Sequence, residues 1–370
     1  MSASRIAPRA LRMASRVGSR APLTTRAATS TYPPSTIRTL TISYPRFKSD
    51  VVKENAIPVS VYDPASKSNG AVHKTISVRP EDRQIPGPAK PPTNEMENLS
   101  LLSDETYEKL PATVKSMTVK DKVFVITGGA RGLGNYMARA CAEAGAKAIA
   151  LFDANQELGD ASAAELHQKT GLPVTFFKVD VRDQGAINAA VQSVCEIYGA
   201  PDVLINSAGI ADSNIPAETY DAAMFRRLID INLTGSFLMS QAVGRAMISA
   251  GKKGSIILVA SISSTIVNYP QEQCCYNASK AGVAQLGKSL AAEWAKYNIR
   301  VNMISPGYMD TALNMVPALD AQKKIWTAST PQGRLGNVDE LNGLCVFLAS
   351  DSSNFMTGAN CLIDGGFCLY

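Results

Sequence analysis

From Lys120 onward, short apolar runs alternate with longer amphipathic stretches, and this alternation limits the possible folds more than any other feature. The apolar runs are VFVIT (123–127), AIALF (148–152), VTFFKV (174–179), VLIN (203–206), SIILVA (255–260), IRVNMI (299–304) and NCLID (360–364). Helical patterns occupy most of the gaps, mainly 132–144, 155–169, 183–198, 219–250 and 276–297. Near-continuous apolar strands separated by helices predict a doubly wound α/β fold, with one parallel sheet covered on both faces.

A glycine-rich loop follows the first predicted strand. The sequence TGGARGLG (127–134) has the spacing TGxxxGxG and leads into a predicted helix. Glycines at 128, 132 and 134 let the backbone turn sharply and approach a pyrophosphate, which binds at the N-terminus of the helix. A simple strand-to-helix turn needs one glycine rather than three in register. The loop therefore predicts a dinucleotide site in a Rossmann fold, which we expect to span residues 115–370.

Asp153 closes the second predicted strand, 19 residues after Gly134. A carboxylate at this place can accept hydrogen bonds from the adenosine ribose, and it would repel a 2′-phosphate. Arg131, inside the glycine-rich loop, could instead receive that phosphate. We expect Asp153 to dominate, because a like-charge clash beside the ribose is costly and Arg131 can turn into solvent. The expected cofactor is NAD, and use of NADP stays open.

The composition excludes several classes of site. His73 and His167 are the only histidines, and the seven cysteines include no CxxC pair. This argues against a Cys/His zinc site and a Ser-His-Asp triad, so we expect no metal. An odd number of irregularly spaced cysteines suits a reducing compartment. No run approaches the 18 or so apolar residues of a membrane span.

The N-terminal segment differs from the rest of the chain. Residues 1–49 contain nine of the 37 basic residues and none of the 32 acidic ones, so the remainder carries 28 basic against 32 acidic residues. A nucleic-acid surface is not expected on that remainder. Arginines and apolar residues recur at helical spacing in the segment, which is typical of a mitochondrial presequence. We predict a presequence at 1–47, processed before Leu40 and then before Lys48, and a soluble enzyme in the matrix. A disordered basic tail or a wrongly chosen start codon is the alternative.

Residues 48–114 are predicted to form a proline-rich arm or linker. Eight prolines lie between positions 50 and 115, and no apolar period is sustained there. Prolines remove hydrogen-bond donors, and the stretch has little apolar surface to bury. Whether the segment wraps a catalytic domain, wraps a neighbouring subunit or only links is left open.

A set of short motifs occurs in a fixed order across residues 115–370. They are Thr127 to Gly134, Asn206-Ser-Ala-Gly209, Asn232, Ser263, Tyr276-Asn-Ala-Ser-Lys280, Ser305-Pro-Gly307 and Asp364-Gly-Gly366. In their order and spacing they resemble the short-chain dehydrogenase/reductase family over roughly 70% of the chain. The resemblance implies an NAD(P)-dependent oxidoreductase and a homotetramer formed through helices 219–250 and 276–297. One departure is Ser207, where the family usually has asparagine.

Tyr276 and Lys280 are the predicted proton-transfer pair. Four residues apart, they project from one face of a helix. A neighbouring ammonium favours the phenolate, so we expect the pKa of Tyr276 to lie below its usual value near 10. Taken alone, a Tyr and Lys pair at this spacing is more often an exposed pair on a helix surface with no catalytic role. Its register with Ser263, thirteen residues before Tyr276, argues for catalysis.

The resemblance assigns two further catalytic roles. Ser263 would donate a hydrogen bond to the substrate oxygen and is not a nucleophile, because no base accompanies it. Ser261 and Ser264 are nearby rivals, and only spacing favours Ser263. Asn232 would hold a proton-relay water near Lys280, and a mid-helix asparagine is disfavoured by propensity.

The cofactor contacts also follow from the resemblance. They are Thr127, Gly128, Arg131, Gly132, Leu133, Gly134, Asp153, Asp180, Val181, Asn206, Ala208, Gly209, Tyr276, Lys280, Pro306, Gly307, Met309 and Thr311. Met309 and Thr311 would meet the nicotinamide carboxamide, and Asp180 with Val181 the adenine. Asp180 could also cap the helix at 183–198.

The segment NYPQEQCCYNASKAG (268–282) resembles fungal polyol and ketose members of the family, such as the D-arabinitol, mannitol and sorbose enzymes. We therefore expect NAD-linked, reversible oxidation of a small polyol to a ketose, with D-arabinitol to D-ribulose as the leading pair. Ser264, Gln273 and Cys274 are the expected substrate contacts. Alternatively, Gln271 to Gln273 cap the next helix in solvent. Cys274 and Cys275 are predicted to be small apolar fillers.

Three rival functions are weighed. An NADPH-linked reductase of a ketose such as L-xylulose would require the same catalytic residues. A mitochondrial 3-oxoacyl-[acyl-carrier-protein] reductase predicts NADPH and a basic patch for its carrier, which Asp153 and the net acidic remainder disfavour. A non-catalytic binding subunit predicts a broken catalytic set, whereas all four expected residues are present.

Overall fold

The computed structural model describes residues 55–62, 71–78, 99–212, 214–311 and 319–369. The chain divides into two compact units, Met1–Arg79 and Pro80–Tyr370. The predicted presequence at 1–47 lies outside the described residues.

The described residues of the first unit, 55–62 and 71–78, form one pair of strands. Strand β1 (Asn55–Tyr62) pairs antiparallel with β2 (Ala71–Val78). The sequence prediction for 48–114 contained no strand, because the prolines outweighed the apolar pattern. Ile57, Val59 and Val61 alternate with other residues, and this period of two was the available signal.

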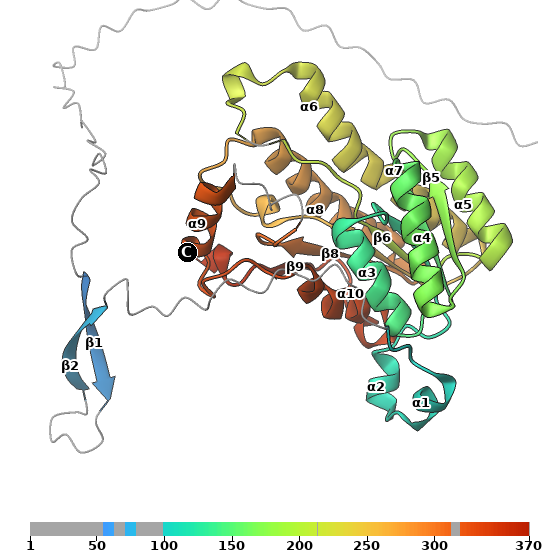
Figure 1. Ribbon diagram of the computed structural model, residues 1–370, viewed down its shortest axis with the longest axis horizontal. Coiled ribbons are helices and arrows are strands. Elements are labelled where there is room, and N and C mark those ends of the chain that lie inside the picture. Colours follow the sequence, from blue (N-terminus) through green and yellow to red (C-terminus); the bar gives the residue numbers. More distant parts are fainter. Residues whose placement is uncertain (1–54, 63–70, 79–98, 213, 312–318, 370) are drawn as a thin grey trace, which may run out of the picture. The chain divides into compact units, whose positions relative to one another are not determined.

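The second unit is built on a seven-stranded parallel sheet, in the order β5-β4-β3-β6-β7-β8-β9 (Figure 1). Its strands are β3 (Val123–Thr127), β4 (Ala148–Asp153), β5 (Val174–Lys178), β6 (Val203–Asn206), β7 (Gly254–Val259), β8 (Ile299–Pro306) and β9 (Asn360–Ile363). Each of the seven predicted apolar runs forms one of them. Because β4 lies on one side of β3 and β6 on the other, the strand order reverses at β3. Ligands of such sheets bind at the carboxyl ends beside this reversal.

Helices cover both faces of the sheet, as predicted for a doubly wound α/β fold (Figure 1). They are α3 (Gly132–Glu143), α4 (Gln156–Thr170), α5 (Gln184–Tyr198), α6 (Ala222–Ile229), α7 (Gly235–Ser249), α8 (Cys274–Trp294), α9 (Asp320–Ser329) and α10 (Asn342–Ala349). The core has two parts. Val123 and Val125 of β3 pack in a cluster with α5, α7 and α8, whereas Phe124 and Ile126 pack with α3, α4 and α10. This alternation is the two-residue period of a strand buried on both faces.

Two short helices precede the first strand of this sheet. They are α1 (Asp104–Lys109) and α2 (Ala112–Ser116), in the part of the chain expected to be an arm or linker. The backbone N–H of Leu102 donates to the carbonyl oxygen of Glu143 at 3.2 Å, at the end of α3. Ser116 Oγ lies 2.7 Å from Ser352 Oγ. The second unit therefore includes residues before the expected boundary at 115.

The long helix predicted at 219–250 is interrupted. A π-helical turn at Asp230–Thr234 separates α6 from α7. The turn contains Asn232, whose side chain is buried. Single π-helical turns inside helices are frequent at functional sites. Within the described part of the chain, no helix combines the length and apolar character that a membrane crossing requires.

The packing of the glycine-rich loop gives a first prediction. A Cβ at Gly134 would lie 2.5 Å from the carbonyl oxygen of Gly128. We expect Gly134→Ala to force the backbone apart and to lower the free energy of unfolding by about 1–3 kcal/mol, measured by urea denaturation. Gly343→Ala in α10 is the matched control, since its added Cβ would meet no atom within 4 Å. That helical substitution should be neutral or stabilise by up to about 1 kcal/mol. Equal midpoints for the two variants would contradict the described packing.

Candidate active site

The carboxyl ends of β3 and β6 are joined by one buried threonine. Thr127 Oγ1 donates to Asn206 Oδ1 at 2.8 Å and accepts the backbone N–H groups of Ser207 and Ala208, each at 3.0 Å. These bonds fix the two strand ends where the strand order reverses. Ser207 contributes its backbone here, so the departure from the usual family asparagine leaves the contact intact.

The glycine-rich loop has the geometry of a phosphate cradle. Gly128 and Gly132 adopt left-handed φ values of 63° and 64°. A Cβ at Gly128 would lie 3.0 Å from Ala208, whereas one at Gly132 would meet no atom within 4 Å. Arg131, at the N-cap of α3, makes no side-chain capping bond. The N-terminus of α3 thus receives no side-chain hydrogen bond from its N-cap residue, and free N–H groups at a helix N-terminus suit an anionic pyrophosphate.

Asp153 lies at the end of β4 beside this loop. Its carboxylate accepts the N–H of Ala130 at 3.3 Å and the N–H of Asn155 at 3.0 Å, and the residue is half-buried. Arg131 is exposed and forms no ion pair with any described residue. The loop and Asp153 thus fit the pyrophosphate and adenosine ribose of a dinucleotide. The free guanidinium of Arg131 leaves a 2′-phosphate chemically possible.

Asp180 and Val181 follow β5. The hydrogen bond from Arg182 to the Asp180 carboxylate lowers the pKa of Asp180. The N-cap of α5 is Asp183, which accepts the N–H of Ala186, so the alternative role of Asp180 as this cap is wrong. Val181 is buried, and its side chain would touch a Cβ placed on Gly235.

Lys280 is a buried cation on α8. Its Nζ donates to the carbonyl oxygen of Val259, at the end of β7, at 2.8 Å. The same atom lies 5.7 Å from the centroid of the Tyr276 ring. Burial lowers the pKa of Lys280 to about 8. The ammonium form therefore still predominates at pH 7, beside Tyr276.

The pKa of Tyr276 does not follow the sequence prediction. Burial raises it above its ordinary value, and a hydrogen bond from Ser261 acts in the opposite direction. The expected lowering by Lys280 is wrong for the protein alone, because desolvation of the phenolate outweighs the stabilising contacts.

Ser261 follows β7 and caps the short helical turn Ile262–Ser264 by accepting the N–H of Ser263 at 3.1 Å. Its own hydroxyl donates to Ser263 Oγ at 3.2 Å. Ser261 is also near enough to Tyr276 for a hydrogen bond that lowers the pKa of the phenol. Ser263, chosen from spacing as the donor to the substrate oxygen, stays a prediction, with Ser261 as its nearest rival.

The other two serines of this turn are engaged elsewhere. Ser263 Oγ donates to Asn268 Oδ1 at 2.5 Å and accepts Gln273 Nε2 at 3.3 Å. Ser264 Oγ accepts Asn360 Nδ2, from β9, at 3.3 Å. Among the described residues, neither hydroxyl is hydrogen-bonded to Tyr276 or Lys280.

Asn232 ties the end of β6 to α8. Its Oδ1 accepts the N–H of Ile210 at 2.9 Å, and its Nδ2 donates to the Ile210 carbonyl at 2.9 Å and to Ser279 Oγ at 3.0 Å. A Cβ on Gly209 would lie 3.2 Å from Asn232 Oδ1 and 3.6 Å from Lys280 Nζ. Asn232 and Lys280 thus both lie beside Gly209, and the relay role expected of Asn232 stays a prediction. Both amide protons of Asn232 are donated to other protein atoms, so a relay water would have to bind another atom of this residue.

The segment after β8 is held by contacts of its backbone and side chains as far as Thr311, the last residue before the undescribed positions 312–318. Pro306 ends the strand, and a Cβ on Gly307 would lie 2.7 Å from Asp364 Cα. Met309 is buried and forms a parallel bridge with Gly336. The N–H of Thr311 donates to the Met309 carbonyl at 2.9 Å.

Gln273 and the two cysteines precede Tyr276. Gln273 is 6% exposed, so the alternative of a solvent-facing helix cap is wrong for this residue. Cys275 is buried, as expected of an apolar filler, but Cys274 is exposed. Its predicted role as a filler is therefore not observed.

Sequence reasoning missed an aromatic and amide cluster beside these residues. The Tyr308 ring stacks on Trp326 of α9, with centroids 4.3 Å apart and planes at 6°. Tyr308 and Trp326 both donate to Gln271 Oε1, at 2.7 and 3.2 Å. Asn268 Nδ2 donates to the Tyr308 hydroxyl at 2.9 Å. The only signal in the sequence was the run of polar residues at 271–273.

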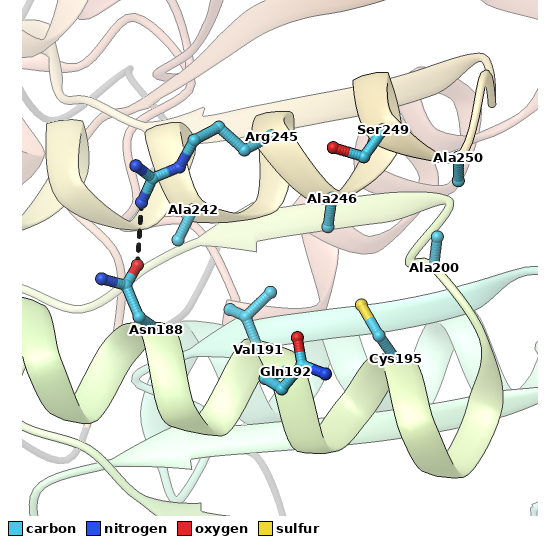
Figure 2. Close-up of a pocket in the computed structure, with 10 residues that line it drawn as sticks. All are labelled: Asn188, Val191, Gln192, Cys195, Ala200, Ala242, Arg245, Ala246, Ser249 and Ala250. Atoms are coloured by element: carbon cyan, nitrogen blue, oxygen red, sulfur yellow. Dashed lines mark hydrogen bonds between the residues drawn. The ribbon is translucent and has the colours of Figure 1, made fainter.

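A separate groove lies between α5 and α7 (Figure 2). Figure 2 shows Arg245 reaching toward Asn188, to which it donates at 2.9 Å. The groove contains none of the predicted site residues. Among the described residues, no group of three or more His, Cys, Asp or Glu side chains could hold a metal ion.

Comparison with known proteins identifies relatives along most of the second unit. Residues 128–368 match the family described as Enoyl-(Acyl carrier protein) reductase. The chain is 39% identical to D-arabinitol 2-dehydrogenase [ribulose-forming] of Candida tropicalis over 281 residues, covering 72% of this chain and 99% of the relative. It is 40% identical to the NADP-dependent mannitol dehydrogenase of Alternaria alternata, covering 68% and 94% of the two chains.

Solved structures share the fold. A gluconate 5-dehydrogenase from Burkholderia cenocepacia, in complex with NADP and tartrate, has a TM-score of 0.65 and 34% identity, and the match covers 70% of this chain and 99% of that one. A short-chain type dehydrogenase/reductase from Mycobacterium marinum has a TM-score of 0.67 and 34% identity, with coverages of 70% and 100%. The chain therefore belongs to the short-chain dehydrogenase/reductase family, whose NAD(P)-dependent enzymes act on alcohol groups.

Proposed function

We propose that the protein oxidises a secondary alcohol of a small polyol to a ketose, reversibly and with NAD, D-arabinitol to D-ribulose being the first candidate pair. The observation that carries the proposal is the position of Tyr276 beside the buried Lys280 at the carboxyl ends of the strands, with the serine turn at 261–264 and buried side-chain amides next to it. Such amides suit a hydroxylated substrate, which an apolar pocket would leave unsatisfied. Several relatives near 39% identity are named for polyols and ketoses, which supports the same class.

In this proposal Tyr276 exchanges the proton. During oxidation its hydroxyl oxygen, as phenolate, takes the proton of the substrate hydroxyl, and Ser263, with Ser261 as the alternative, hydrogen-bonds the same substrate oxygen. Lys280 supplies a nearby positive charge that opposes the effect of burial on the phenolate. The glycine-rich loop and Asp153 would hold NAD⁺, which would supply the acceptor for the hydride. Asn232 holds Gly209 and α8 in the arrangement that brings these groups together.

The preference for NAD is argued from Asp153. Its carboxylate is held against the glycine-rich loop by Ala130 and Asn155, so it cannot easily move away from a 2′-phosphate. The relative from Alternaria alternata is named as NADP-dependent, and Arg131 is free to bind a phosphate. NADP is therefore the second cofactor to test.

The rival functions make different demands. An acyl-carrier-protein reductase has the support of the name of the matching family. It requires recognition of a thioester and an acidic carrier, whereas residues 50–370 carry more acidic than basic side chains. An NADPH-linked ketose reductase would use the same groups in the opposite direction. A non-catalytic subunit would have no need for a buried Lys280 beside Tyr276.

We further propose a mitochondrial matrix location and a homotetramer. The first is supported by the arginine-rich, acid-free residues 1–47. The second is supported by the apolar side chains Met224, Phe225 and Phe237, which are 38–40% exposed on α6 and α7. These helices lie in the segment 219–250, one of the two segments, with 276–297, through which the family resemblance implies assembly.

The function is tested by steady-state kinetics on a substrate panel. Pentitols, hexitols and acetoacetyl thioesters are assayed with NAD(H) and NADP(H), by absorbance of the reduced nicotinamide. We expect the highest kcat/KM for a pentitol with NAD. Asp153→Ser should lower the ratio of NAD to NADP use by at least about tenfold, since it removes the repulsion of the 2′-phosphate. Preference for a thioester with NADPH would contradict the proposal.

The two serines make a second, matched test. Ser263→Ala should lower kcat for alcohol oxidation by about 100-fold, as loss of a donor to the reacting oxygen does. Ser261→Ala should cost less than about tenfold in kcat. It should also move the rise of the oxidation rate to higher pH, because the Ser261 hydrogen bond lowers the pKa of Tyr276. The opposite order of the two variants in kcat would move the donor role to Ser261.

A further inference from the structure

A chain of hydrogen bonds near the site has a fixed direction, which is set by Trp326. The indole N–H can only donate, and it meets Gln271 Oε1 at 3.2 Å. The oxygen of this amide therefore faces the aromatic pair. The Tyr308 hydroxyl lies 2.7 Å from the same oxygen and must donate its one proton there. Stacking on Trp326 and an edge contact with Phe367, at 5.1 Å between centroids, hold the Tyr308 ring in place.

The next residue in this chain of hydrogen bonds is Asn268, which is 5% exposed. Because the proton of Tyr308 is already used, its oxygen accepts Asn268 Nδ2 at 2.9 Å. Asn268 Oδ1 then lies on the opposite side of the amide. It accepts from Ser263 Oγ at 2.5 Å and from Gln273 Nε2 at 3.0 Å. The orientation of each amide thus follows from the one before it.

This sequence of bonds fixes the amide of Gln273. Its NH₂ group faces Asn268, and it also lies 2.9 Å from Asn277 Oδ1 and 3.3 Å from Ser263 Oγ. Its Oε1 must point the other way, and no described residue donates to it. The fully enclosed side-chain atoms without a partner in the described chain are Arg139 Nε, Gln322 Oε1, Asn337 Oδ1 and Asn342 Oδ1. Gln273 Oε1 is not one of them, so it keeps access to solvent on an otherwise buried side chain.

The position of this acceptor connects it to the reaction. Gln273 bonds Ser263, which is in the same turn as Ser261, and it precedes Tyr276 by three residues. We infer that Gln273 Oε1 accepts a hydrogen bond from a second hydroxyl of the substrate, distinct from the one that is oxidised. The inference rests on the proposed polyol function and specifies the atom that selects for it.

Because Gln273 Oε1 can only accept a hydrogen bond, it determines which substrates the site favours. Gln273 cannot rotate its NH₂ group toward the substrate without breaking its bond to Asn268, so the site offers an oxygen and no donor. A hydroxyl satisfies that oxygen, whereas a methylene, a ketone or a thioester carbonyl leaves it unpaired. Sites built to bond a hydroxyl reject analogues that lack it strongly. Gln273 thereby favours polyols over simple alcohols and acyl thioesters.

The test pairs a substrate change with a residue change. The wild type and Gln273→Met are assayed on the best pentitol and on its monodeoxy analogues. We expect one analogue to lose about 100-fold in kcat/KM with the wild type, and the variant to discriminate less than about tenfold between that analogue and the parent. A merely structural role would lower activity on all substrates equally, so an unchanged discrimination in Gln273→Met would overturn the inference.

A second variant covers the case in which Gln273→Met does not fold. Trp326→Phe keeps the stacked ring but removes the N–H that sets the direction, so discrimination should fall by at least about threefold, and unchanged discrimination would contradict the inference. Thermal unfolding and NAD binding check that both variants are intact. If the wild type uses polyols no better than a simple secondary alcohol, the proposed function fails as well. If it prefers polyols but the variants discriminate as the wild type does, only the inference about Gln273 fails.

Discussion

The hydrogen bond from Lys280 to the carbonyl oxygen of Val259 holds α8 on the carboxyl end of β7. It places Tyr276, one helical turn earlier, beside Ser261 at the end of the same strand. The arrangement is costly, because burial lowers the pKa of Lys280 to about 8 and raises that of Tyr276. A buried ammonium with one carbonyl oxygen as its hydrogen-bond partner does not favour the stability of the fold. It is useful where a phenol must gain and lose a proton.

Much of this architecture could be predicted from the sequence. The seven apolar runs became seven strands. The runs of β3, β4, β6, β7 and β8 are continuous because these strands are buried on both faces, whereas the edge strands β5 and β9 are only partly buried. The glycine-rich loop was recognisable because close approach, such as that of Gly134 to Gly128, leaves no room for a side chain. The family motif placed Asn232 near Lys280, and in the structure both side chains lie beside Gly209.

Other features could not be predicted, for physical reasons. The direction of a hydroxyl in the tight turn at 261–264 depends on its tertiary neighbours, so spacing alone could not show that Ser263 bonds Asn268 or that Ser261 lies near Tyr276. The network of Gln271, Tyr308 and Trp326 joins three segments far apart in the chain, and no local pattern reports such contacts. The strand pair at 55–78 was missed because its prolines suggested a linker.

The most direct test of the account is the rate of alcohol oxidation by Tyr276→Phe, measured together with NAD binding. The phenyl ring keeps the packing beside Lys280 but cannot exchange a proton. General acid–base catalysis contributes about 10²–10⁴-fold, so kcat should fall by at least about 100-fold while NAD binding is retained. Oxidation at the wild-type rate by the folded, NAD-binding variant would contradict the central claim that Tyr276 transfers the proton.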